Sequence, residues 1–310
     1  MIHLIYNQAL RGMNISQAKA LPFVEAATNN FPNEIGVIEL EIAELEPANN
    51  QTLQTLDDLA LVHRRSYVED VLSKKIPDGY GDTGGRNLHQ IINANYCLLS
   101  AVRRTMADAE VRCIAAPVSG FHHAERAHGG GFCTFNGLAA ATVLAIQNIG
   151  RVTILDFDDH YGNGTVDCLK SLNRDWSSKI CHFTYGGYSV ANNKHFFNRF
   201  LKKVIEKCIF EFQPAIVLYQ AGVDSHTNDR IGSKTLTTEM LADRDFAVFT
   251  ACRNAEIPIV WNLAGGYQTV DRVVELHLQT VAIATTVFKE EPSNYAFKNR
   301  ASTQQPRSSW

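Results

Sequence analysis

The chain has 310 residues and a net charge of −3, with 45% hydrophobic and 20% charged residues, which is the composition of a soluble globular protein. This balance offers no basic footprint, so it argues against direct binding to nucleic acid or to an anionic membrane surface. The longest apolar runs fall short of the roughly 18 residues of a membrane-spanning helix, and the start MIHLIYNQALRG lacks the pattern of a secretory signal.

In chain order, a strand at His3–Tyr6, a helix at Ser16–Thr28 and a weaker strand at Ile35–Leu40 are expected first. After a longer helix, short apolar runs alternate with amphipathic ones, as in βαβ units with a buried parallel sheet. The later strands are expected at Arg112–Ala116, Val152–Phe157, Lys179–Phe183, Ala215–Tyr219 and Pro258–Leu263. The helices are expected at Asn87–Asp108, Asn136–Asn148, His195–Phe212, Thr237–Ala255 and Val270–Phe288.

These elements predict an α/β fold. It is expected as a single three-layer α/β/α domain with a central, mainly parallel sheet over residues 1–289. A polar, irregular tail at residues 290–310 follows it. In such folds the loops past the carboxyl ends of the strands carry the functional residues, so the polar side chains of those loops are expected to meet at one edge.

The cysteines are scattered, and no two of them form a C-x-x-C pair. Several lie in apolar runs, and their number is odd. This pattern predicts reduced, mostly buried thiols in a cytoplasmic protein rather than a disulfide framework. The seven are Cys97, Cys113, Cys133, Cys168, Cys181, Cys208 and Cys252.

One strand-end loop has the residue types of a catalytic zinc site. Asp158 and His160 are two residues apart in an extended segment and can face one ion together, and Asp224 follows another strand. One imidazole and two carboxylates leave a coordination position open for water. The alternative is that Asp156 and Asp158 only cap a strand end and His160 is an ordinary loop histidine.

Two further features point to proton transfer and carbonyl activation beside that loop. The adjacent His122 and His123 follow a neighbouring strand and suit proton transfer, although they could be plain exposed loop histidines. Tyr267 follows two glycines after the last strand, where its hydroxyl can donate to a carbonyl as negative charge builds there. The alternative for Tyr267 is that it only packs at the start of the next helix.

Several blocks together resemble the histone deacetylase family, over about residues 60–285 and in the family's order. They are LVHRRSYVEDVL, GFHHAERAHGGGFCTFNGLAAA, ILDFDDHYGNGT, YQAGVDSHTNDRIG and LAGGYQ. Within the family of histone deacetylases and acetylpolyamine amidohydrolases, the chain resembles the small single-domain, class IV-like branch. The features that carry this resemblance are the short chain and the GFHH and GGYQ motifs. The resemblance implies an arginase–deacetylase fold and a zinc-dependent amidohydrolase that removes an acyl group from an amine.

The resemblance also implies a role for each matching residue. Zinc would be bound by Asp158, His160 and Asp224, and Asp156 oxygens would help to hold a structural K+ or Na+. His123 would be the general base and then acid, with His122 as electrostatic support. Asp156 and Asn163 would orient the two histidines, Tyr267 would donate to the oxyanion, and Gly131 and Phe132 would line the acyl channel.

The chain departs from the family pattern at some positions. Tyr161 replaces a second histidine, the usual PPGHH is VSGFHH, Ala264 stands where a glycine is common, and TYGGYSV after Phe183 differs from the family's loop. The acidic residue that anchors the substrate matches either Asp78 or Asp82.

The expected substrate is an acyl-lysine side chain in a protein or peptide; the alternative is an acetylpolyamine or another small amide. Two rival functions are a two-manganese ureohydrolase and a metal-containing binding protein of weak activity. The single histidine of the metal loop disfavours the first, and the retention of Tyr267 with both His122 and His123 disfavours the second. The sequence leaves the oligomeric state open.

Overall fold

A computed structural model of the chain describes residues 1–11, 17–45, 49–187 and 193–289. Its centre is a seven-stranded sheet with the order β2-β1-β3-β7-β6-β4-β5, in which every neighbouring pair is parallel. The strands are β1 (Ile2–Tyr6), β2 (Ile35–Glu39), β3 (Cys113–Ala116), β4 (Val152–Asp156), β5 (Ile180–Thr184), β6 (Ile216–Gln220) and β7 (Ile259–Asn262).

The inner strands are short, continuous apolar runs because helices cover both faces of the sheet. Every residue of β3, β4, β6 and β7 is buried, whereas in the edge strand β2 only Ile35 is buried and the other residues are partly or fully exposed. The strands predicted for the second half of the chain are therefore confirmed, each within a few residues. The two N-terminal strands are confirmed as well.

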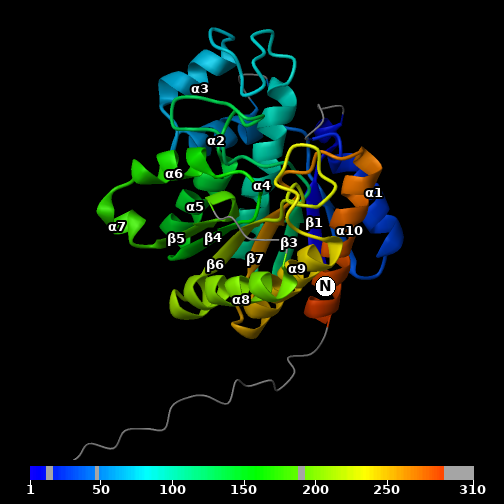
Figure 1. Cartoon of the computed structure of the whole chain (residues 1–310). Helices are drawn as coiled ribbons and strands as arrows, with labels where there is room; N and C mark the ends of the chain where they lie inside the picture. The colour runs from blue at the N-terminus through cyan, green and yellow to red at the C-terminus, as the bar shows by residue number, and fades with distance from the viewer. Residues whose placement is uncertain (12–16, 46–48, 188–192, 290–310) are drawn as a thin grey trace, which may run out of the picture.

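The helices form two rows on opposite sides of the sheet (Figure 1). In one row α8, α9, α10 and α1 pack against one another in succession; the other contains α2, α4, α5 and α6. The helices are α1 (Ala20–Asn30), α2 (Asn50–Leu59), α3 (Arg65–Leu72), α4 (Leu88–Ala107), α5 (Gly137–Asn148), α6 (Asn163–Lys170), α7 (Arg174–Ser177), α8 (Lys194–Ile205), α9 (Thr238–Asn254) and α10 (Val270–Lys289). Helices, sheet and helices thus make the three-layer α/β/α architecture.

Some elements differ from the expectation in detail. The helix expected at His195–Phe212 is α8 followed by a π-helical stretch at Glu206–Glu211. The sequence does not predict the short helices α2 and α6, because both segments are brief and mostly polar. Asn49 begins α2 by accepting a hydrogen bond from Thr52 N. Ser16, the expected start of the first helix, and the expected tail at 290–310 lie outside the described residues.

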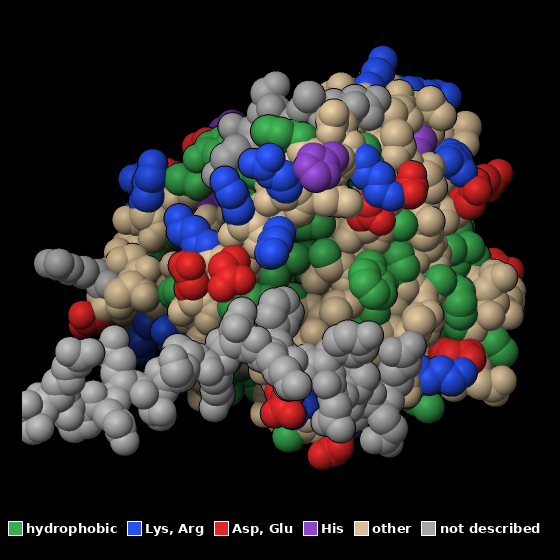
Figure 2. Space-filling view, turned by 60° about the horizontal axis from the view of Figure 1, so that its bottom comes forward, with side chains coloured by type: hydrophobic (Ala, Val, Ile, Leu, Met, Phe, Trp, Pro, Cys, Tyr) green, Lys and Arg blue, Asp and Glu red, His purple; other side chains and the backbone are tan. Residues whose placement is uncertain are grey.

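Surface charge is not evenly spread over the molecule. Helix α8 exposes Arg199, Lys202 and Lys203 along one side. Figure 2 turns this lower part of the molecule toward the viewer and shows Lys and Arg side chains lying next to one another there. The net charge of −3 therefore describes the whole chain but not each face. None of the described helices is long and apolar enough to cross a membrane.

The strand order decides which loops meet. Strands β3, β7, β6 and β4 are successive neighbours, although β4 follows β3 in the chain and β7 comes last. Because all four run in the same direction, the segments after their carboxyl ends lie side by side at one edge of the sheet. These segments contain the histidine pair His122 and His123, the loop 263–269 with Tyr267 (the tyrosine loop), and both parts of the candidate metal centre.

Candidate active site and metal centre

Three side chains from two loops converge at this edge. Asp158 and His160 follow β4, Asp224 follows β6, and their ligand atoms all lie within 4.8 Å of one another. His160 Nδ1 is 3.0 Å from Asp158 Oδ1 and 2.9 Å from Asp224 Oδ2. Both aspartates are buried and the histidine is half-buried, so the group lies at the bottom of a depression rather than on an open surface.

The donor set fits a catalytic zinc ion. One imidazole nitrogen and two carboxylates are ligands that zinc accepts, with a further position left for water or substrate. Asp224 Oδ2 is fully buried, yet it accepts no well-directed hydrogen bond from the described residues. Burial and the nearby Asp158 carboxylate raise the pKa of Asp224 to about 8. A bound cation would offset this repulsion between the two carboxylates.

A glycine lets the backbone close over the same centre. Gly265 N donates to Asp158 Oδ2 at 2.8 Å. A Cβ at Gly265 would lie only 2.5 Å from Asp158 Oδ2 and from Asp224 Oδ2. The loop after β7 can therefore approach the two carboxylates only with a glycine at this position.

His122 is buried and bonded to a carboxylate. Its Nδ1 lies 2.7 Å from Asp156 Oδ2, and its Nε2 lies 3.5 Å from Asp158 Oδ1. Burial alone would lower the pKa of His122, but these two carboxylates outweigh it and raise the pKa to about 9. Gln220 fixes Asp156 from behind by donating to its Oδ1 at 2.8 Å. The two carboxylates therefore favour the protonated, positively charged form of His122.

His123 has a different environment, although the two rings are 4.1 Å apart. Its Nδ1 lies 2.6 Å from Asn163 Oδ1, and Asn163 Nδ2 donates to Glu125 Oε1 at 3.0 Å. Burial and the charge on His122 lower the pKa of His123 below its usual value. Its partner is a neutral amide, so no carboxylate in direct contact opposes this shift. The result is a neutral imidazole next to the metal centre, which is the form that accepts a proton.

Tyr267 and Phe132 stand over the centre. The Tyr267 ring lies 6.2 Å from the Phe132 ring and 6.1 Å from the His160 ring, measured between centroids. Burial raises the pKa of Tyr267, so its hydroxyl stays protonated and can donate a hydrogen bond. Position 131, next to Phe132, requires glycine. Its φ is +54°, and a Cβ there would lie 2.5 Å from His123 Cδ2.

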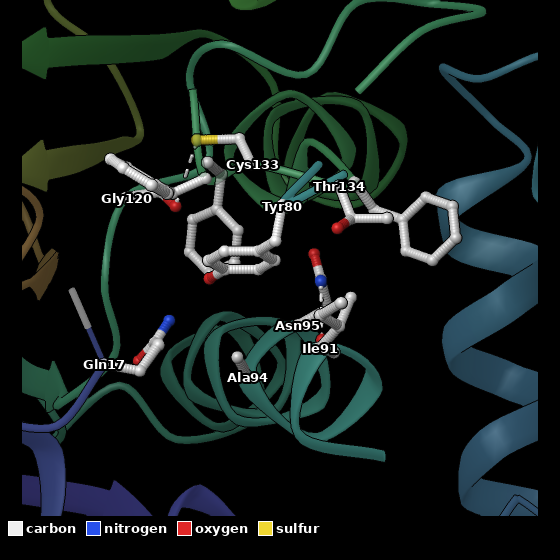
Figure 3. A pocket seen from close by; sticks show the side chains of 11 residues that line it. Gln17, Tyr80, Ile91, Ala94, Asn95, Gly120, Cys133 and Thr134 are labelled. Carbon is white, nitrogen blue, oxygen red and sulfur yellow. Dashed lines mark hydrogen bonds between the residues drawn. The ribbon is translucent and has the colours of Figure 1, made fainter. Parts of the chain in front are cut away.

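These groups share one small cavity, lined by Ser119, Gly120, His122, His123, Gly131, Phe132, Cys133, Asp158, Gly265 and Tyr267. A second cavity shares Gly120, Phe132 and Cys133 with the first and extends toward α4. Figure 3 shows it between Gln17, Tyr80 and the α4 residues Ala94 and Asn95. The two spaces therefore adjoin at one wall.

The two aspartates that match the substrate-anchoring position are occupied within their own loop. Asp78 Oδ1 accepts hydrogen bonds from Tyr80 N and Asp82 N. Asp82 pairs with the Arg86 side chain at 2.9 Å. Both contacts are those of turn-forming residues, and neither side chain lines the catalytic cavity.

Sequence reasoning missed several supporting side chains. Gln220 and Glu125 lie inside recognised blocks, but their contacts depend on how the loops meet. Lys19 is buried and donates through Nζ to Ala264 O in the tyrosine loop. Burial lowers the pKa of Lys19 to about 8, although the carboxylates of the site oppose that shift. A lone lysine among apolar residues, as in QAKALPF, was the one available signal.

Comparison of the sequence with known protein families identifies the family of the chain. The sequence profile of the histone deacetylase domain matches residues 26–183 and 187–282, which is more than half of the chain. The chain therefore belongs to the histone deacetylase family, and its parallel sheet with helices on both sides is the arginase–deacetylase fold.

Named relatives support the same family. The chain is 30% identical to histone deacetylase 10, chloroplastic, of Oryza sativa subsp. japonica, over 82% of this chain and 64% of that protein. It is 32% identical to histone deacetylase 2 of Arabidopsis thaliana, over 48% of this chain and 42% of the relative. Histone deacetylase 6 of Arabidopsis thaliana is 24% identical over 78% and 58%, respectively. The matches thus span between 42% and 64% of the lengths of these relatives.

Proposed function

We propose that this chain is a zinc-dependent deacylase that removes an acetyl or longer acyl group from an amine, with an acyl-lysine side chain as the substrate. The observation that carries the proposal is that one cavity is lined by both histidines, by Tyr267 and by Asp158, which belongs to the Asp–His–Asp group. The pKa of His122 is raised and that of His123 is lowered, so the two differ in charge. A protein that only bound metal would not need these two histidines or Tyr267.

The proposed chemistry assigns a task to each residue. Asp158, His160 and Asp224 would hold zinc, which when bound polarises an amide carbonyl and activates water. His123, being neutral, accepts the proton of the attacking water and delivers it to the leaving amine nitrogen. The Tyr267 hydroxyl donates to the carbonyl oxygen as negative charge develops there.

The remaining residues of the site prepare this arrangement. Asp156 holds His122 as an imidazolium whose positive charge stabilises the developing oxyanion, and Asn163 fixes the ring of His123. Gly131 and Phe132 form the wall along which the substrate's aliphatic stem would lie. The second cavity is small but meets the first at Gly120, Phe132 and Cys133, so acyl chains longer than acetyl are included to test whether the two spaces open into one.

Further expectations accompany this proposal. A cytoplasmic location is supported by the free, mostly buried cysteines. Membership of the class IV-like branch is supported by the GFHH and GGYQ blocks. A structural K+ or Na+ at Asp156 stays an expectation, since both oxygens of that carboxylate already accept hydrogen bonds, from Gln220 and from His122.

The decisive experiment is hydrolysis of a panel of substrates by the purified protein. Acyl-lysine peptides from acetyl to long-chain acyl and acetylpolyamines are compared, with and without a chelator, and metal content is measured in parallel. We expect acyl-lysine hydrolysis that the chelator abolishes and added zinc restores. A preference for acetylpolyamine would move the substrate to the small amines, and urea release from a guanidino substrate would support a ureohydrolase instead.

Variants of the three ligands test the metal assignment separately from activity. Asp158→Ala, His160→Ala and Asp224→Ala each remove one donor, so each is expected to lose most of its zinc as well as its activity. Full zinc occupancy in all three variants would refute the assignment. Tyr267→Phe serves as the opposite case, because it should keep zinc while kcat/KM falls by about 10²-fold or more.

A further inference from the structure

Two hydrogen bonds join the tyrosine loop to the loop that contains the proposed metal ligand Asp224. Val223 N donates to Gly265 O at 2.9 Å, and Tyr267 N donates to Asp229 Oδ2 at 2.8 Å. Asp229 is only 1% exposed. A buried carboxylate thus holds the backbone of the residue whose hydroxyl is proposed to act on the substrate.

The other oxygen of the same carboxylate shapes the metal-ligand loop. Asp229 Oδ1 accepts from Ile231 N at 2.9 Å and from Gly232 N at 3.1 Å. Gly232 in turn lies against the metal ligand, since a Cβ there would be 1.9 Å from Asp224 O. The Asp229 side chain therefore stabilises the turn next to Asp224 and also binds the backbone of Tyr267.

We propose that Asp229 is a positioning residue that sets the place of the Tyr267 hydroxyl relative to the metal centre. This inference rests on the proposed function for the role of Tyr267, while the contact itself is independent of it. Hydrogen bonds to a carboxylate are stronger than those to a neutral acceptor, and burial shields them from water. An error of about 1 Å in the placement of a catalytic group can cost about 10²-fold in rate.

Asp229→Asn separates the two tasks of the carboxylate. An asparagine can keep its oxygen toward the N–H groups of the turn, but it then presents an N–H to Tyr267 N, which is also a donor. We expect kcat to fall by about ten-fold or more with a smaller change in KM, while zinc content stays close to wild type. The two buried N–H donors that then face each other should lower the melting temperature by a few degrees. Loss of zinc in this variant would overturn the proposal, because the residue would then support the metal site instead.

The matched control is Asp108→Asn at the end of α4. Asp108 Oδ1 also accepts a backbone hydrogen bond two residues ahead, from Glu110 N at 3.1 Å, but the residue lies outside the catalytic cavity. This variant should retain wild-type kcat. A similar fall in kcat for both variants would show a general cost of the Asp→Asn change and would overturn the proposal.

A double variant tests whether Asp229 acts through the tyrosine hydroxyl. If it does, Asp229→Asn combined with Tyr267→Phe should be no slower than Tyr267→Phe alone, to within about two-fold. Two losses that multiply would mean that Asp229 affects the rate by another route.

Amide hydrogen exchange tests the contact without any substrate. The metal-loaded protein is compared with its Asp229→Asn variant in peptides covering residues 264–268. Loss of the Tyr267 N–H hydrogen bond should speed exchange of that amide by about ten-fold or more, with little change in α4. Unchanged exchange would overturn the positioning role. An inactive wild type with faster exchange in the variant would instead contradict the proposed function alone.

Discussion

His122 and His123 are adjacent in the chain but differ in charge because their partners differ. The Asp156 and Asp158 carboxylates, working against burial, keep the pKa of His122 near 9. His123 faces the neutral amide of Asn163, and burial together with the charge on His122 lowers its pKa below the usual 6.5. The pKa values of two identical side chains are thereby shifted in opposite directions.

The pH dependence of kcat/KM should depend on the charge of residue 163, because that residue is the hydrogen-bond partner of His123. In the wild type the acid limb should lie below pH 6.5, because activity is lost as His123 takes up a proton. A carboxylate at position 163 favours that protonated form, so Asn163→Asp should move the acid limb to higher pH by about one unit. Glu125 lies 3.0 Å from Asn163 Nδ2, so the substitution is made together with Glu125→Gln.

The control for this pair is Glu125→Gln alone, measured over the same pH range. It should leave the acid limb close to the wild-type position, since no charge has been placed beside His123. An acid limb that stays unchanged in the double variant would argue that His123 is not the base seen in the profile.

At the scale of an element, four residues of the loop after β7 both contact the metal centre and bring Tyr267 to the cavity. Ala264, with φ at +52°, turns the chain, and Gly265 brings a backbone N–H onto Asp158. Tyr267 then reaches the cavity from the same loop. The approach depends on the absence of a side chain at Gly265, whose Cβ would lie 2.5 Å from both carboxylates.

Gly265→Ala should therefore disrupt the metal centre although position 265 contributes no side-chain ligand. The added methyl group forces the loop away from Asp158 and Asp224, and we expect zinc affinity to fall by about ten-fold or more. Competition with a chromogenic chelator measures this. Gly84→Ala, where the nearest atom to a Cβ is Asp82 Oδ1 at 3.3 Å in an exposed loop, is the control and should bind zinc as the wild type does. Equal affinities in the two variants would contradict the steric argument.

At the scale of the whole molecule, the fold buries most of the thiols. All seven cysteines are free; six of them are buried and Cys181 is partly exposed. Burial raises the pKa of Cys113, Cys133 and Cys168 to about 12, so these thiols are poor nucleophiles at neutral pH.

A thiol titration without reductant should reflect this arrangement. In the native protein Cys181 should react first and the other six slowly, whereas all seven should react at once in denaturant. Mass spectrometry of the alkylated protein identifies the modified residues. Fewer than seven reactive thiols after unfolding would reveal a disulfide and contradict the reduced state.

The sequence by itself determined the parallel α/β fold, since uninterrupted apolar runs form strands only where helices cover both faces of a sheet. It also picked out the residues that meet at one edge, from Asp158 and Asp224 to Tyr267, because loops after parallel strands share that edge. It did not predict short helices such as α2, whose segment is brief and mostly polar.

Only the tertiary structure decided what depends on contacts between distant segments. The sequence could not tell that Glu125 accepts a hydrogen bond from Asn163 or that Lys19, just before α1, donates one to the tyrosine loop. Nor could it tell that Asp229 accepts a hydrogen bond from the Tyr267 amide. The strand order, with β7 between β3 and β6, brings these segments together. The opposite charge states of His122 and His123 have the same origin, because burial and the distance to a carboxylate are properties of the folded chain.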